Sequence, residues 1–261
     1  MKTKSMLLFL LVFPMLSWAQ GVDVPPRHII DYPTAGLLRR GGFDVQARFY
    51  GESGLYLATN VGISPRFMFG VSFGGTNVLG ERKPNWNSQP GVLLRFQAIG
   101  ESTSLPAVTL GFESQGYGAF LDSTNRFLNK SPGFYVVGSK SYSAAALLQR
   151  FDFHGGVNFS LERGDGDKDI NFFLGTTIGV NDDVEILFEY DLAFNDSPEK
   201  DRTVGDGKGY FNSGIRFNIA NIVYLEFFLK NLFDNNRASQ VLASREKYTR
   251  EVKITYFQFI M

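Results

Sequence analysis

From Gly42 to Met261 the chain consists of short segments in which every second residue is apolar and its neighbours are polar, charged or Gly. The segment 184–192, for example, alternates Val, Ile, Phe, Tyr and Leu with positions that include Glu185, Glu189 and Asp191. A period of two is typical of β-strands, because successive side chains point to opposite faces. A soluble sandwich would turn the Phe-rich face inward, whereas a membrane barrel turns it to lipid and keeps the charges in its lumen.

Twelve strands are expected, and many have close to the roughly nine to eleven residues that a tilted strand needs to cross a bilayer. The expected ranges are Phe43–Tyr50, Leu55–Gly62, Arg66–Gly74, Val92–Ile99, Ala107–Glu113, Phe134–Lys140, His154–Glu162, Ile170–Val180, Val184–Leu192, Tyr210–Asn218, Val223–Leu232 and Arg250–Met261.

The connections between these strands alternate in length. Most even ones are short, such as Ile63–Pro65 and Asn181–Asp183, and several odd ones are long and polar, such as Ser114–Gly133 and Ala193–Gly209. Gly51–Gly54 and Arg163–Asp169 are short exceptions among the odd connections, and Ser141–Phe153 is a longer one among the even connections. Outer-membrane barrels have short periplasmic turns and long outer loops. The loops therefore favour a single transmembrane antiparallel β-barrel over residues 42–261, with both of its ends in the periplasm.

The first residues indicate export. Lys2 and Lys4 precede an apolar run that ends near Leu16, and Ser17 and Ala19 then offer small residues for cleavage. This pattern predicts a secretory signal peptide over residues 1–19, cleaved after Ala19. Without the two lysines, 24 basic residues remain against 26 acidic ones, a net charge of about −2. This balance argues against a nucleic-acid partner, and the expected location is the outer membrane of a Gram-negative bacterium.

Charged residues gather on the opposite face from the apolar one. Between Phe43 and Leu232 a register exists that leaves the apolar face free of Asp, Glu, Lys and Arg. The other face carries a charged network that we expect to line the lumen: Arg48, Arg95, Glu113, Glu185, Glu189, Asp191, Arg216, Glu226 and Lys230. Asp44 and Glu162 fall on the same face. The acids of segment 184–192 could face Arg216 across the neighbouring strand, as a salt-bridge network or as the charge filter of a narrow pore.

Two segments are harder to interpret. In the last strand Gln258 shares a face with apolar residues and Lys253 shares the other with Phe257, so a bulge near Tyr256 is expected to switch the faces. Residues 20–41 contain three prolines together with large apolar residues that favour burial. This segment is either an extended periplasmic lead-in or a plug in the barrel lumen, where inward-facing glycines would leave room for it.

Residues that could carry chemistry are few. The histidine of the seventh expected strand, His154, faces the lumen at the periplasmic end, away from the outer half of the wall where barrel hydrolases place theirs. Asp165, Asp167 and Asp169 have the spacing that opens a calcium loop, but Ile170 takes the position of the required Gly, so a solvated outer turn is expected. We expect no catalytic residues, cofactor or metal.

Some short motifs resemble those of YjbH-like proteins, outer-membrane β-barrels associated with exopolysaccharide production. The matching positions are Leu105–Gly111, Gly116–Phe120, Pro33–Ala35, Ser139–Lys140, Glu189–Asp191, and Asn212, Gly214 and Arg216. The resemblance implies a non-enzymatic envelope protein that assists exopolysaccharide export or production, with polysaccharide or export components as partners beside membrane lipid and the barrel-assembly machinery. The alternatives are a small passive diffusion pore and an outer-membrane enzyme that modifies lipid or peptide.

Overall fold

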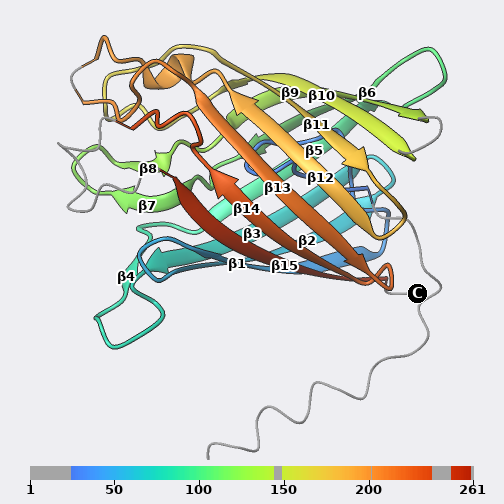
Figure 1. The fold of residues 1–261 in the computed structure, drawn as a ribbon, viewed down its shortest axis with the longest axis horizontal. Coiled ribbons are helices and arrows are strands. Elements are labelled where there is room, and N and C mark those ends of the chain that lie inside the picture. Colours follow the sequence, from blue (N-terminus) through green and yellow to red (C-terminus); the bar gives the residue numbers. More distant parts are fainter. Residues whose placement is uncertain (1–24, 144–148, 201, 237–247, 260–261) are drawn as a thin grey trace, which may run out of the picture.

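The computed structural model describes residues 25–143, 149–200, 202–236 and 248–259, which form one closed antiparallel β-barrel (Figure 1). Its wall consists of β1 (Gly42–Tyr50), β2 (Gly54–Ser64), β3 (Phe67–Thr76), β5 (Gly91–Ile99), β6 (Ala107–Glu113), β9 (Gly133–Ser143), β10 (Arg150–Phe159), β11 (Asn171–Gly179), β12 (Val184–Asp191), β13 (Tyr210–Ile219), β14 (Val223–Lys230) and β15 (Thr249–Phe259). These twelve strands confirm the predicted fold class.

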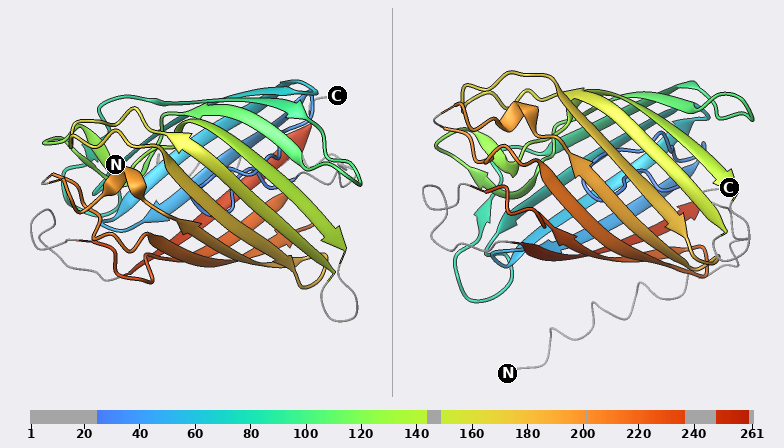
Figure 2. Two further views of the ribbon diagram at one scale, coloured as in Figure 1. Left: turned by 90° about the horizontal axis from the view of Figure 1, so that it is seen from above. Right: turned by 45° about the horizontal axis from the view of Figure 1, so that its top comes forward.

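Each strand of the wall pairs with the next one along the chain, and the pairing of β1 with β15 closes the barrel. The turns at one end are short, as between β11 and β12 or between β13 and β14. The connections at the opposite end are mostly long, and β1 to β2 is the short exception. We call these the inner end and the outer end. The predicted alternation of loop lengths is therefore present, and Figure 2 shows the long connections gathered at one end of the barrel.

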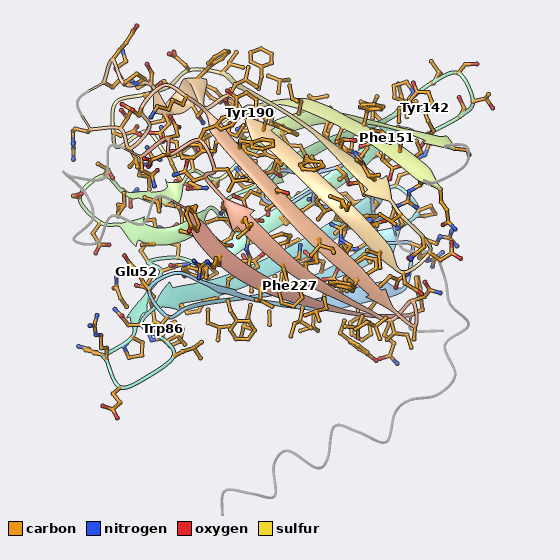
Figure 3. All side chains as sticks on the ribbon, in the orientation of Figure 1. Glu52, Trp86, Tyr142, Phe151, Tyr190 and Phe227 are labelled. Atoms are coloured by element: carbon orange, nitrogen blue, oxygen red, sulfur yellow. The ribbon has the colours of Figure 1, made fainter. Side chains whose placement is uncertain are left out.

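The strands place apolar side chains outside and polar ones inside. Exposed side chains on the outer surface include Leu57, Phe153, Leu174 and Phe227, each at least 42% accessible. A surface of this kind is stable where lipid is the solvent. Figure 3 shows Phe227 and Phe151 on the outer wall, with Trp86 towards the outer end and Tyr142 towards the inner end.

Lys140 lies on the outer face, which the sequence predicts to be free of charged side chains. It lies on the same face of β9 as the exposed Phe134 and Val136, at the inner end of the strand, where its ammonium group is 3.3 Å from Glu101. At this level a lysine can reach beyond the apolar region, so the charge is tolerated there and would be costly at mid-strand.

The last strand also differs from the prediction, because β15 pairs with β1 and β14 in continuous register and has no bulge near Tyr256. Phe257 points into the lumen together with Glu251 and Lys253, whereas Gln258 lies outside and accepts a hydrogen bond from Tyr256. The mixed faces need no bulge, because the lumen offers Phe257 an apolar contact that is described below.

The outer loops contain structure that the sequence did not predict. The two-residue strand β4 (Asn85–Trp86) pairs with the outer end of β3, and β7 (Tyr117–Leu121) pairs with β8 (Arg126–Asn129) in a separate hairpin. The strand expected over His154–Glu162 is shifted, since β10 ends at Phe159. Glu162 therefore belongs to an outer loop, where it accepts hydrogen bonds from the amides of Phe127 and Ser131.

The predicted signal peptide, residues 1–19, lies outside the described residues. The single helix within them is η1 (Phe194–Asp196), and none of their helices could cross a membrane.

Candidate functional site

The barrel lumen is occupied by the segment that precedes β1. Residues 26–38, which we call the plug, run inside the barrel and fold into a tight turn (Figure 2). The amide of Ile29 donates to the carbonyl of Tyr32, and the amide of Thr34 donates to that of Arg27, both at 2.9 Å. The sequence left open whether this segment is a periplasmic lead-in or a lumen plug. In the structure residues 26–38 lie inside the lumen.

Three apolar contacts hold the plug against the wall. Ile29 and Ile30 pack with Leu187 and Phe228, and Tyr32 stacks on Phe173 with ring centroids 4.5 Å apart. The third contact joins the end of the plug to the last strand, because Leu37, Leu38 and Phe257 belong to one buried cluster together with Met68 and Leu93. Burial of these plug side chains stabilises docking by at most about 1.5–3 kcal/mol each.

Two glycines of the wall leave room for the plug. A Cβ atom at Gly62 would lie 2.7 Å from the carbonyl oxygen of Leu38, and one at Gly175 would lie 2.8 Å from the Cδ1 atom of Ile29.

The carboxylate of Glu189 binds the turn of the plug. Its Oε2 atom accepts hydrogen bonds from three consecutive amides, those of Ile30, Asp31 and Tyr32, at 3.0, 2.9 and 2.8 Å. Its other oxygen accepts a hydrogen bond from Asn212 at 2.9 Å. Successive amides that converge in this way form an anion-binding nest, so the charge of Glu189 is matched by main-chain dipoles.

Asp31 of the plug pairs with two cations of the wall. One of its oxygens is 2.6 Å from Arg48 and the other is 2.7 Å from Lys230. Both cations also contact Glu251, at 2.5 and 3.2 Å. Burial alone would raise the pKa of Asp31, but the two cations outweigh it and hold this pKa at about 2. Asp31 is therefore ionised at neutral pH.

Arg27 and His28 also contact acids of the lumen wall. Arg27 pairs with Asp44 at 2.6 Å. His28 Nε2 lies 3.0 Å from Glu113 and 2.9 Å from Arg95 Nη2. Burial lowers the pKa of His28 to about 4, against the opposing effect of Glu113. The imidazole is therefore neutral at pH 7, and Nε2 either donates to Glu113 or accepts from Arg95.

Arg216 joins the plug to a charge network within the wall. It donates to Glu185 at 2.7 Å, to Glu226 at 2.8 Å and to the carbonyl of His28 at 2.9 Å. Lys253 adds a second contact to Glu226 at 2.9 Å. The network therefore reaches both the plug and the last strand.

All nine residues of the predicted network face the lumen. Six of them contact the plug: Arg48, Arg95, Glu113, Glu189, Arg216 and Lys230. The expectation that three acids of β12 face Arg216 is wrong for two of them. The register pairs Glu185 with Arg216 but sets Glu189 opposite Asn212 and Asp191 opposite Tyr210. Asp191 instead accepts a hydrogen bond from Asn171 at 2.7 Å.

The predicted solvated turn with Asp165, Asp167 and Asp169 is also different in the structure. Asp165 is buried and lies 2.6 Å from Arg126 and 2.8 Å from Lys130. Arg126 also pairs with Asp196 at 2.6 Å, so three outer loops share one ion-pair cluster. The sequence offered no signal for it, because its members are far apart along the chain. The described residues contain no group of three or more His, Cys, Asp or Glu that could hold a metal.

His154 lies in the lumen beside the plug. Its Nδ1 atom is 2.8 Å from the hydroxyl of Ser139, and this hydroxyl also accepts the amide of Ala35 at 2.8 Å. Thr177 lies 3.4 Å from the other ring nitrogen. The plug thus occupies the space in front of this pair.

A cavity of about 800 Å³ lies at the outer end. Tyr50, Asn129, Lys230 and Glu251 are among the residues that line it. The cavities beside the plug, such as the one between Asp31 and Asn212, are about 10 Å³ each, room for about one water molecule. Among the described residues the lumen is therefore filled at the level of the plug.

No protein-family model matches the chain, and neither does any curated protein. The solved structures it resembles include the KdgM porin, with a TM-score of 0.50 and 10% identity over 84% of this chain and 99% of that one. The NanC porin is also similar, with a TM-score of 0.45 and 11% identity over 84% of this chain and 100% of that one. The closed twelve-strand barrel and its likeness to the KdgM porin show that the protein has the fold of a porin-like outer-membrane β-barrel.

Proposed function

We propose that the protein is a narrow passive diffusion channel of the Gram-negative outer membrane, closed in this conformation by its plug. The observation that carries the proposal is the twelve-strand barrel with a charged lumen, which resembles the KdgM porin over nearly the whole of that chain. The apolar outer surface supports a place in lipid, and the alternating loop lengths support an orientation with the long loops outside the cell.

A role in exopolysaccharide export is supported only by the resemblance to YjbH-like proteins, so this role stays a prediction. The diffusion channel is favoured because it follows from the fold and the lumen together. An enzymatic role has no comparable support, since Ser139 and His154 lie beside the plug and Ser139 already accepts the amide of Ala35.

Conductance in planar bilayers tests the proposal. The full chain should give rare, short openings, because the plug fills the lumen. Deletion of residues 21–38 behind an intact signal peptide should give frequent and larger openings and make cells more sensitive to bulky antibiotics. The strands begin at Gly42, so this deletion leaves the wall complete. A deletion variant that shows the heat-modifiable gel mobility of a folded barrel but conducts no current would refute the channel.

A further inference from the structure

We propose that the lumen wall is a binding site for peptide main chain, which the plug occupies as a built-in ligand, and that Glu189 is the residue that retains it. The closure of the channel by the bound plug rests on the proposed channel function, whereas the binding of the plug can be measured separately.

The wall recognises the plug mainly through main-chain atoms. Six wall side chains hydrogen-bond to its amides or carbonyls: Arg48, Arg95, Thr109, Ser139, Glu189 and Arg216. A buried polar group that has no hydrogen-bond partner costs free energy. The six polar side chains directed at the plug therefore indicate that the wall binds its main chain specifically.

The contacts are arranged by polarity around the turn. The carboxylate of Glu189 approaches from β12 and accepts the amides of residues 30–32. Arg216 approaches from β13 and donates to the carbonyls of His28 and Ile29, and Arg48 approaches from β1 and donates to that of Ile30. The turn therefore lies between an acid that matches its amides and two bases that match its carbonyls.

Side-chain contacts then select one register of the plug. Asp31 enters between Arg48 and Lys230, and Arg27 pairs with Asp44. The ligand class that suits this site is thus a short peptide turn with an acidic residue at its tip. Residues 26–38 of the same chain supply it.

The attachment to β1 allows the plug to leave the lumen. Arg39 and Arg40 are exposed, and Gly41 has a φ of 77°, a conformation that favours glycine. These residues lie at the inner end, where β1 begins, so a rotation about them would carry the plug out of the barrel without breaking a strand pair.

Thiol accessibility in the full chain tests retention, because the protein has no cysteine of its own. Ala35 is 1% exposed in the docked plug. Ala35→Cys should react slowly with a bulky water-soluble maleimide, and adding Glu189→Gln should speed the reaction about tenfold or more, since three hydrogen bonds lose their charged acceptor. The matched control is Asp152→Asn, another buried lumen carboxylate, which pairs with Arg150. It should leave the rate unchanged. Gel mobility shows first that each variant is folded.

A disulfide tests closure. Ser139 Oγ lies 2.8 Å from the amide nitrogen of Ala35, so Ala35→Cys with Ser139→Cys should form a cross-link between plug and wall. The oxidised barrel should be silent in planar bilayers, and reduction should restore openings.

The outcomes separate the two proposals. If Glu189→Gln labels no faster than Asp152→Asn, Glu189 does not retain the plug and the inference is wrong. If the oxidised barrel conducts as well as the reduced one, the plug does not close the channel. If labelling responds as expected but the barrel without residues 21–38 never conducts, retention stands and the channel function falls.

Discussion

The substitution Asp31→Asn removes the negative charge of the plug and keeps the size of the side chain. The carboxylate of Asp31 contacts Arg48 and Lys230, and Asp31 is 4% exposed, so solvent screens these ion pairs little. Its pKa of about 2 lies below the ordinary value of 3.8. This difference corresponds to about 2–3 kcal/mol of docking free energy at neutral pH. The plug of the variant should therefore leave the lumen roughly 30- to 150-fold more often.

The measurement is the open probability of the full chain in planar bilayers at pH 7, with Asp206→Asn as the control. Asp206 pairs with Lys208 on an exposed outer loop, where an ion pair contributes little. The pKa of Asp31 also fixes the pH dependence. A lowered carboxyl pKa stabilises the docked state above about pH 4, and this contribution is lost as the pH falls through about 2. Equal open probabilities for Asp31→Asn and the control would show that these ion pairs do not hold the plug.

Three further predictions concern the wall, the plug histidine and the outer loops. Phe188→Arg, mid-strand on the outer face, should block assembly because a lipid-facing Arg costs about 2–4 kcal/mol. Glu189→Gln, one residue away on the lumen face, should still fold. Equal heat-modifiable gel mobility of the two variants would contradict the assignment of faces. His28 has its pKa lowered to about 4, so undocking takes up a proton between about pH 6.5 and 4; openings should become more frequent as the pH falls through this range, and His28→Gln should flatten the profile. Arg126→Met should make the outer loops of the folded protein more sensitive to protease by at least several-fold, since Arg126 joins Asp165 to Asp196; unchanged cleavage rates would show that the cluster does not hold the loops.

Much of the wall could be predicted from the sequence, because the alternation of apolar and polar residues is a property of neighbouring positions. It located twelve strands and set Phe188 outside and Glu189 inside. It failed where the environment is not uniform along a strand. Lys140 is on the outer face because it lies at the inner end of β9, and Phe257 is inside because Leu37 and Leu38 of the plug give it an apolar partner.

The partners of the lumen charges were decided only by the tertiary structure. The sequence placed Glu185 and Glu189 on one face. The pairing register of β12 with β13 then sets Glu185 opposite Arg216, whereas Glu189 binds the plug. The prolines of residues 25–38 excluded a regular strand, and the large apolar residues favoured burial, without saying where. Curvature of the sheet brings β1, β12 and β14 around one small space, and only in that space do the amides of the turn meet Glu189 while Asp31 meets Arg48 and Lys230. Contacts between residues this far apart depend on closure of the whole barrel. The alternation of apolar and polar residues along the chain does not predict them.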